Sequence, residues 1–260
     1  MSISRRTTLT FMLAASLAST IGGLPFNTLP ILLGALADSF SFDAAQIGQL
    51  GSICFAGYLV GTLVAVAFID RMNWRYLTVG CAVGAALALL ASARLPAQAQ
   101  APLWALIGFI ASLMTCLGLR IMSEMADKER ALGVRQGIEL GLVAALLFAL
   151  PSLVVARFHY AGAALVLAAI ILLLSLSALA LPRRSDFAKA VDVVGERSLY
   201  ARFSFPLPAY FALAAFFLFG AGQIGLWAFL ERLGHGLALQ PTELGIVFAT
   251  STPFDTPFHM

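Results

Sequence analysis

The sequence predicts an all-α transmembrane protein, and two observations indicate this fold class. Long apolar stretches recur along the chain, and the arginine and lysine residues lie almost entirely in alternate gaps between them. A helix needs about 20 apolar residues to cross the hydrocarbon core of a bilayer, and each stretch is close to that length. The predicted spans are Thr8–Leu36, Ile47–Ile69, Leu77–Ala93, Leu103–Met122, Ile138–Ala156, Ala161–Leu181 and Pro208–Leu230.

The composition agrees with this fold class and argues against several others. Hydrophobic residues make up 60% of the chain, charged residues only 11%, and the mean hydropathy is +0.92. These values lie far from those of a soluble domain. The net charge of +3 resides in short loops, so we expect no nucleic-acid partner. No His/Cys cluster has metal-ligand spacing, and we expect neither a metal nor a cofactor. The three cysteines lie far apart inside apolar stretches and are expected to be small buried residues.

The distribution of basic residues predicts the orientation. Short loops rich in lysine and arginine stay on the cytoplasmic side during insertion. The gaps opposite to these loops hold only Arg94 and Arg157. We therefore expect a multi-pass protein of the plasma membrane, a bacterial inner membrane, with a cytoplasmic N-terminus. The basic residues on the predicted cytoplasmic side are Arg5, Arg6, Arg71, Arg75, Lys128, Arg130, Arg135, Arg183, Arg184, Lys189, Arg197 and Arg202.

The chain divides into four predicted segments. Residues 1–182 hold six spans, residues 183–206 form a charged cytoplasmic linker, residues 207–250 hold the seventh span, and residues 251–260 form an irregular tail. A shift of 197 residues places Gly23 on Gly220 and Gly48 on Gly245, so the seventh span begins like the first. This match suggests that a second copy of the six-helix block starts after the linker.

The loop between the second and third spans carries a family resemblance. It reads Ala-Phe-Ile-Asp-Arg-Met-Asn-Trp-Arg, and Asp70, Arg71 and Arg75 fall on the charged positions of a cytoplasmic pattern of the major facilitator superfamily. Val66 stands where that pattern has a glycine. Together with the six-span block and its linker, the chain resembles this superfamily. The resemblance implies two six-helix halves, each of two inverted three-helix repeats, and solute transport by alternating access. It also implies that the loop braces the inward-closed state.

Only the first helix of a second half is expected, because residues 251–260 contain two prolines and no span. We therefore expect a truncated transporter of the superfamily that lacks half of its binding site. The alternatives are a permease of another repeat-built family, and a membrane fragment that either has no function or depends on a partner that supplies the missing half. An enzyme is not expected, because the three histidines lie outside the spans or at their ends.

Four residues are candidates for the substrate pathway. Asn27 shares a helix face with Ser19 and Gly23, and nearby prolines interrupt backbone bonding, which favours either pathway lining or an interhelical hydrogen bond. Glu139 is a candidate for proton coupling, but it could instead pair with Arg135 one turn away. The other two candidates, in the seventh span, are Gln223 and Trp227.

Charged residues at the cytoplasmic ends of the spans are candidates for a gating loop. Arg120 and Glu124 end the fourth span, and Arg71 or Arg75 could pair with Glu124. Small residues four apart are expected to allow close helix packing. These residues are Gly57, Gly61, Ala65, Gly80, Gly84, Gly133, Gly137 and Gly141.

Overall fold

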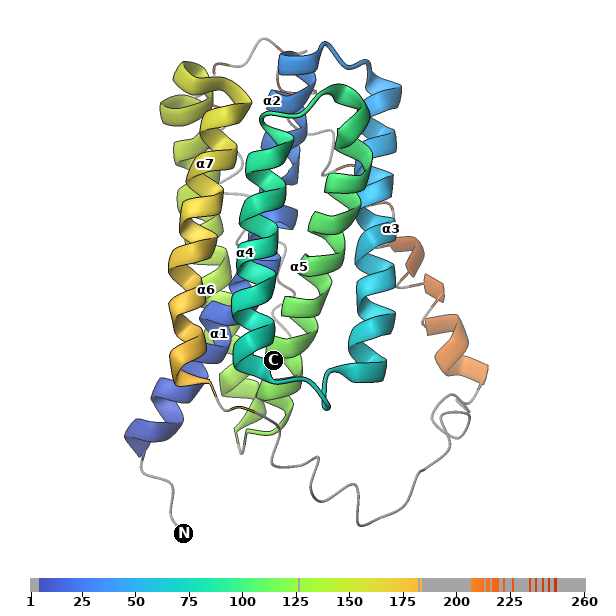
Figure 1. Cartoon of the computed structure of the whole chain (residues 1–260). Helices are drawn as coiled ribbons and strands as arrows, with labels where there is room; N and C mark the ends of the chain where they lie inside the picture. Colours follow the sequence, from blue (N-terminus) through green and yellow to red (C-terminus); the bar gives the residue numbers. More distant parts are fainter. Residues whose placement is uncertain are drawn as a thin grey trace.

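The computed structural model describes residues 5–125, 127–181 and 183, and scattered residues between 207 and 246. The described part is helical and contains no strand. The helices stand side by side and alternate in direction, with the N-terminus at one end of the bundle (Figure 1). The elements are α1 (Arg5–Asn27), α2 (Leu29–Phe40), α3 (Ala44–Phe68), α4 (Trp74–Ser92), η1 (Ala97–Ala99), α5 (Gln100–Ser123), α6 (Lys128–Ala149), η2 (Leu150–Val155), α7 (Ala156–Leu174) and η3 (Ser175–Ala180).

Five helical segments of the described residues are long and apolar enough to cross a bilayer. The longest, Lys128–Ala180, has 53 residues and combines two crossings. It reverses at His159, whose φ of 53° and ψ of −155° are not helical. The reversal lies between the predicted fifth and sixth spans, in agreement with the sequence. About half of the predicted seventh span is described, and its described residues are helical; the apolar helix Leu207–Phe219 covers its first part.

The first predicted span is broken into two helices. Thr28 separates α1 from α2, with Pro25 just before it and Pro30 just after it. Hydrogen bonds continue across the break, because the Thr28 N–H donates to the Leu24 carbonyl at 3.0 Å and the Leu32 N–H donates to the Thr28 carbonyl at 3.1 Å. Pro25 and Pro30 have no backbone N–H and so cannot donate the helical hydrogen bonds at their own positions. The two bonds through Thr28 nevertheless keep α1 and α2 running in the same direction.

Polar side chains define where the next two helices begin. Asp43 and Gln46 form a capping box at the start of α3, in which each side chain accepts a hydrogen bond from the backbone N–H of the other residue. Asn73 caps α4 by accepting from the backbone N–H groups of Arg75 and Tyr76. These caps fix the first residues of α3 and α4 close to the start of the predicted second and third spans.

Glycines allow α3 and α5 to pack closely. A Cβ atom at Gly57 would fall on the backbone carbonyl of Ala105, and one at Gly108 would fall on that of Cys54. The two glycines therefore face each other's helix at backbone distance, as the four-residue spacing in α3 predicts. On α6 the same spacing makes no such contact within the described residues, because a Cβ at Gly133, Gly137 or Gly141 meets no atom within 4 Å. On α4 the same holds for Gly80, whereas a Cβ at Gly84 would lie 3.0 Å from the Ile110 side chain of α5.

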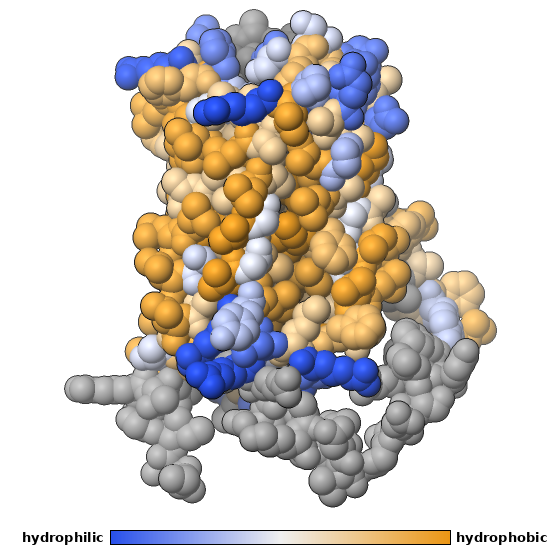
Figure 2. Space-filling view, in the orientation of Figure 1, coloured by the Kyte–Doolittle hydropathy of each residue, from blue (hydrophilic) through white to orange (hydrophobic). Residues whose placement is uncertain are grey.

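The surface of the bundle carries the signature of a membrane protein. Apolar side chains cover its sides, and hydrophilic residues gather at its two ends (Figure 2). At the end opposite the N-terminus, the buried Ser92 hydroxyl bonds to Gln100 at 2.6 Å and to the Tyr160 hydroxyl at 2.7 Å. This triad ties α4, α5 and α7 together where they reach the membrane surface.

Candidate functional site

Four polar residues meet between α1 and α6, and we call them the α1–α6 polar cluster: Ser19, Asn27, Arg135 and Glu139. The Arg135 Nη2 atom lies 2.8 Å from the Glu139 Oε2 atom, and the Arg135 Nε donates to the Ser19 hydroxyl at 2.7 Å. The Asn27 amide donates to the Glu139 Oε1 atom at 3.1 Å and to the Gly23 carbonyl at 2.9 Å. Both carboxylate oxygens of Glu139 are therefore bonded, one from each helix.

Helical spacing brings this cluster together. Ser19, Gly23 and Asn27 follow one another at four-residue steps and lie on one face of α1. Arg135 and Glu139 have the same spacing on α6, with the cation toward the N-terminus of the helix. Gly23 gives the carboxyl group its room, because a Cβ there would overlap the Glu139 side chain.

The cluster is buried within apolar helices. Glu139 is 6% exposed, and Ser19 is fully buried. A buried ion pair contributes little net stability, but removing one partner costs about 3–5 kcal/mol because the other charge is left uncompensated. Ionisable groups within membrane segments are functional candidates by default. The arrangement can therefore hold one internal charge pair and can respond when either charge is changed.

Aromatic residues lie next to the cluster. Phe26, the neighbour of Asn27, packs edge to face on Phe55 and Tyr58 of α3, with ring centroids 5.0 and 4.6 Å apart. The end of α1 is thus held against α3 beside the polar cluster.

A second polar network lies at the N-terminal end of the bundle. Arg120 at the end of α5 bonds to Asp70 at 2.7 Å and to Glu124 at 2.9 Å. The Arg75 Nε donates to the Leu181 carbonyl, and the Trp74 N–H donates to the Arg183 carbonyl at 3.0 Å. The α3–α4 loop is thereby joined to the end of α5 and to the segment after η3.

The predicted gating residues do not all join this network. Arg71 is exposed and has no ion pair within the described part of the chain. The sequence offered Arg71 or Arg75 as partners for Glu124, whereas the structure pairs Glu124 with Arg120. The helix geometry explains the difference, because residues 120 and 124 are one turn apart on α5. Gln223 and Trp227 lie outside the described residues.

No group of three or more His, Cys, Asp or Glu residues in the described segments could hold a metal ion. The network and the cluster instead link membrane helices to one another by ion pairs.

The model of the Major Facilitator Superfamily matches residues 7–253 of the 260-residue chain. The chain belongs to this superfamily. The recognition made from the α3–α4 loop and the span pattern is thus confirmed. Members of the superfamily are transporters and not enzymes, so this chain is a multi-pass membrane protein of a transporter family. A search of curated proteins gave no match.

The candidate residues predicted from sequence omitted three members of the site. Ser19, Gly23 and Arg135 complete the surroundings of Asn27 and Glu139. The sequence held signals for all three, since Ser19 and Gly23 share the face of Asn27 and Arg135 precedes Glu139 by one turn. It held no signal for the pairing of α1 with α6, because that contact joins residues 112 positions apart.

Proposed function

We propose that this superfamily member is a secondary transporter that moves a small solute across the membrane by alternating access. Binding would take place beside the α1–α6 polar cluster. The observation that carries the proposal is the buried Arg135–Glu139 pair, bonded to Asn27 across two membrane helices. In transporters of this class, substrate and coupling-ion sites lie near the bilayer midplane.

The depth of the cluster supports this site. Glu139 is the twelfth residue of the 22-residue α6. A helical rise of 1.5 Å per residue sets it roughly 17 Å from the start of the helix. The predicted fifth span begins only at Ile138, but the Glu139 carboxyl group packs against Gly23, which lies near the middle of the predicted first span Thr8–Leu36, and this contact places the carboxyl group close to mid-depth.

Glu139 is also the proposed coupling group. Protonation would remove its charge and release the Arg135 guanidinium from its ion pair. The freed cation would then be available to an anionic group of the solute. Because Asn27 and Arg135 bond to different oxygens of the carboxylate, protonation would weaken the contact between α1 and α6 as well.

The ion pairs at the N-terminal end suit a gate. Asp70, Arg120 and Glu124 connect the ends of α3 and α5, while Arg75 holds the segment after η3. Asp70 is about half exposed, with a side-chain exposure of 51%, so its pair with Arg120 can open at little cost. We propose that this network braces the state that is closed on the cytoplasmic side. Arg71 would contribute to this network through the long-range attraction of its positive charge for the nearby carboxylates, without a direct ion pair.

The architecture proposed for the whole transporter has two six-helix halves, each of two inverted three-helix repeats. The described helices would form the first half, and residues 207–250 would begin the second. The open glycine face of α6 at Gly133, Gly137 and Gly141 suits close approach by another helix. We propose that the other half of the site, supplied by a partner if this chain acts as half a transporter, packs against this face. Gln223 and Trp227 would then face the pathway.

Cysteine labelling tests the pathway and the orientation together. The three native cysteines are first replaced by alanine, and a membrane-impermeant thiol reagent is applied to intact cells and to inverted vesicles. We expect Asn27→Cys to react, because a pathway residue meets water, and Ser39→Cys to react from outside in the plasma membrane. Ala56→Cys, on the exposed face of α3, is the lipid-facing control and should not react.

Two results would count against the proposal. An unreactive Asn27→Cys from both sides would leave Asn27 as an interhelical hydrogen bond without a pathway. Protection of Ser39→Cys in intact cells, with reaction in inverted vesicles, would reverse the orientation.

A further inference from the structure

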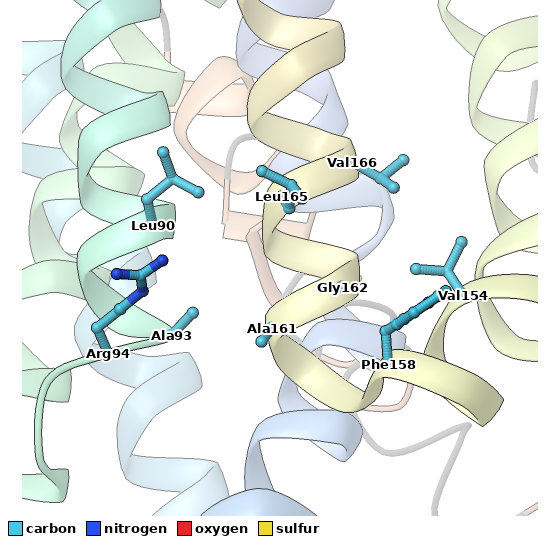
Figure 3. A pocket seen from close by; sticks show the side chains of 9 residues that line it. All are labelled: Leu90, Ala93, Arg94, Val154, Phe158, Ala161, Gly162, Leu165 and Val166. Atoms are coloured by element: carbon cyan, nitrogen blue, oxygen red, sulfur yellow. The ribbon is translucent and has the colours of Figure 1, made fainter.

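An apolar groove of about 460 Å³ opens at the end of the bundle away from the N-terminus. It lies between the end of α4, the π-helical segment η2 and the first turns of α7 (Figure 3). Leu90, Val154, Phe158, Leu165 and Val166 supply most of its wall. Nothing polar enters from these residues, so the body of the groove suits a hydrocarbon chain.

One cation lies at this groove. Arg94 follows the last turn of α4, and its side chain reaches back between α4 and α7 in Figure 3. No lining residue is acidic, and Arg94 has no ion pair within the described residues. The guanidinium therefore offers its charge to a ligand, not to a carboxylate of the protein.

The groove faces the bilayer. Phe158 is 64% exposed and Leu165 is 59% exposed, although both are large apolar residues. On a membrane protein such side chains meet lipid tails. Arg94 lies at the end of the helix, where polar residues gather and where the headgroups of a bilayer lie (Figure 2).

We propose that this groove binds an anionic phospholipid, with one acyl chain between α4 and α7 and the phosphate on Arg94. The volume lies in the lower half of the range of ligand cavities, about 300–1,000 Å³, which fits part of one chain and not a whole lipid. A planar guanidinium bonds a phosphate through two N–H groups at once. In the orientation proposed above, the lipid belongs to the outer leaflet.

The test measures lipid association with the full chain. The protein is placed in nanodiscs of phosphatidylcholine that contain trace spin-labelled phosphatidylglycerol or spin-labelled phosphatidylcholine, and the immobilised fraction of each probe is measured. We expect wild-type protein to prefer phosphatidylglycerol. Arg94→Gln should weaken this preference about fivefold, the ratio that corresponds to about 1 kcal/mol per basic residue at a membrane surface.

Two further variants separate this site from general charge and from protein contacts. Arg157→Gln removes the exposed arginine at the same end, outside the groove, and should leave the preference unchanged. Ala161→Phe fills the groove and should lower immobilisation of phosphatidylglycerol. Equal effects of Arg94→Gln and Arg157→Gln would overturn the proposal, as would an Ala161→Phe variant that keeps its bound lipid. A lower mass of Ala161→Phe in detergent with unchanged lipid binding would assign the groove to a second protein chain and also overturn it.

Discussion

The ion pair between Arg135 and Glu139 allows a quantitative test of the candidate site. Replacing Arg135 by methionine keeps the unbranched first part of the side chain and removes its charge, while Glu139→Gln removes the opposite charge. Each single change leaves one buried charge without its partner. The double variant leaves neither.

The structure sets the expected magnitudes. Glu139 is 6% exposed and Arg135 bonds to it at 2.8 Å, so each single variant should lose about 3 kcal/mol, at the low end for breaking a buried pair. The double variant should lose less than either single variant, because paired charges add little net stability. Asn27→Ala should cost much less, about 0.6 kcal/mol, the average for a hydrogen bond between membrane helices.

The assay is unfolding of the purified chain in detergent, followed by the fluorescence of the buried Trp74 and Trp104. On the scale of soluble domains of this size, about 3 kcal/mol lowers the melting temperature by roughly 6–12 °C. The losses of the two single variants should not add in the double variant. Additive losses would refute the reasoning, because they would mean that the two charges do not stabilise one another in the folded chain.

The pH dependence of the same variants gives an independent sign. In Arg135→Met the unpaired Glu139 can lose its charge by binding a proton, so the deficit relative to wild type should shrink as the pH falls. In Glu139→Gln the unpaired arginine keeps its charge throughout, so its deficit should not shrink in this way. A deficit of Arg135→Met that grows at acidic pH would contradict both the charge argument and the coupling role proposed for Glu139.

Two further predictions concern the packing that positions the site. Gly57→Leu should lower the melting temperature strongly, because the new side chain would meet the Ala105 backbone. Gly137→Leu should leave the melting temperature unchanged. It should weaken only the association with a second half, which is measured as the mass of the complex in detergent. Equal melting temperatures of the two variants would contradict the close contact of α3 with α5. Ser92→Ala should cost about 1–3 kcal/mol, because it leaves the buried Gln100 and Tyr160 short of a partner, while Ser52→Ala on the exposed face of α3 should cost almost nothing. A Ser92→Ala variant as stable as Ser52→Ala would show that the triad does not hold α4, α5 and α7 together at the end of the bundle opposite the N-terminus.

Much of the fold could be predicted because the insertion of a helix into a bilayer depends on the hydrophobicity and length of its own segment. The length of the apolar stretches predicted the helices, and five helical segments among the described residues are long and apolar enough to cross a membrane. Prolines marked the break at Thr28, and the glycine spacing in α3 indicated that another helix packs closely there. Only the structure identifies that helix as α5, and on α6 the same spacing meets no described helix, because glycines permit a close approach without selecting the partner.

The sequence alone determined which segments enter the membrane, the family to which the chain belongs, and the helix faces on which Asn27 and Glu139 lie. All three depend on interactions within one helix or between one helix and lipid. Only the tertiary structure decided that Asn27 bonds to Glu139 and that Arg120 joins Asp70 to Glu124. The physical reason is that every membrane helix presents several faces of similar apolar character. Close packing of backbones and the need to pair each buried charge select which faces meet.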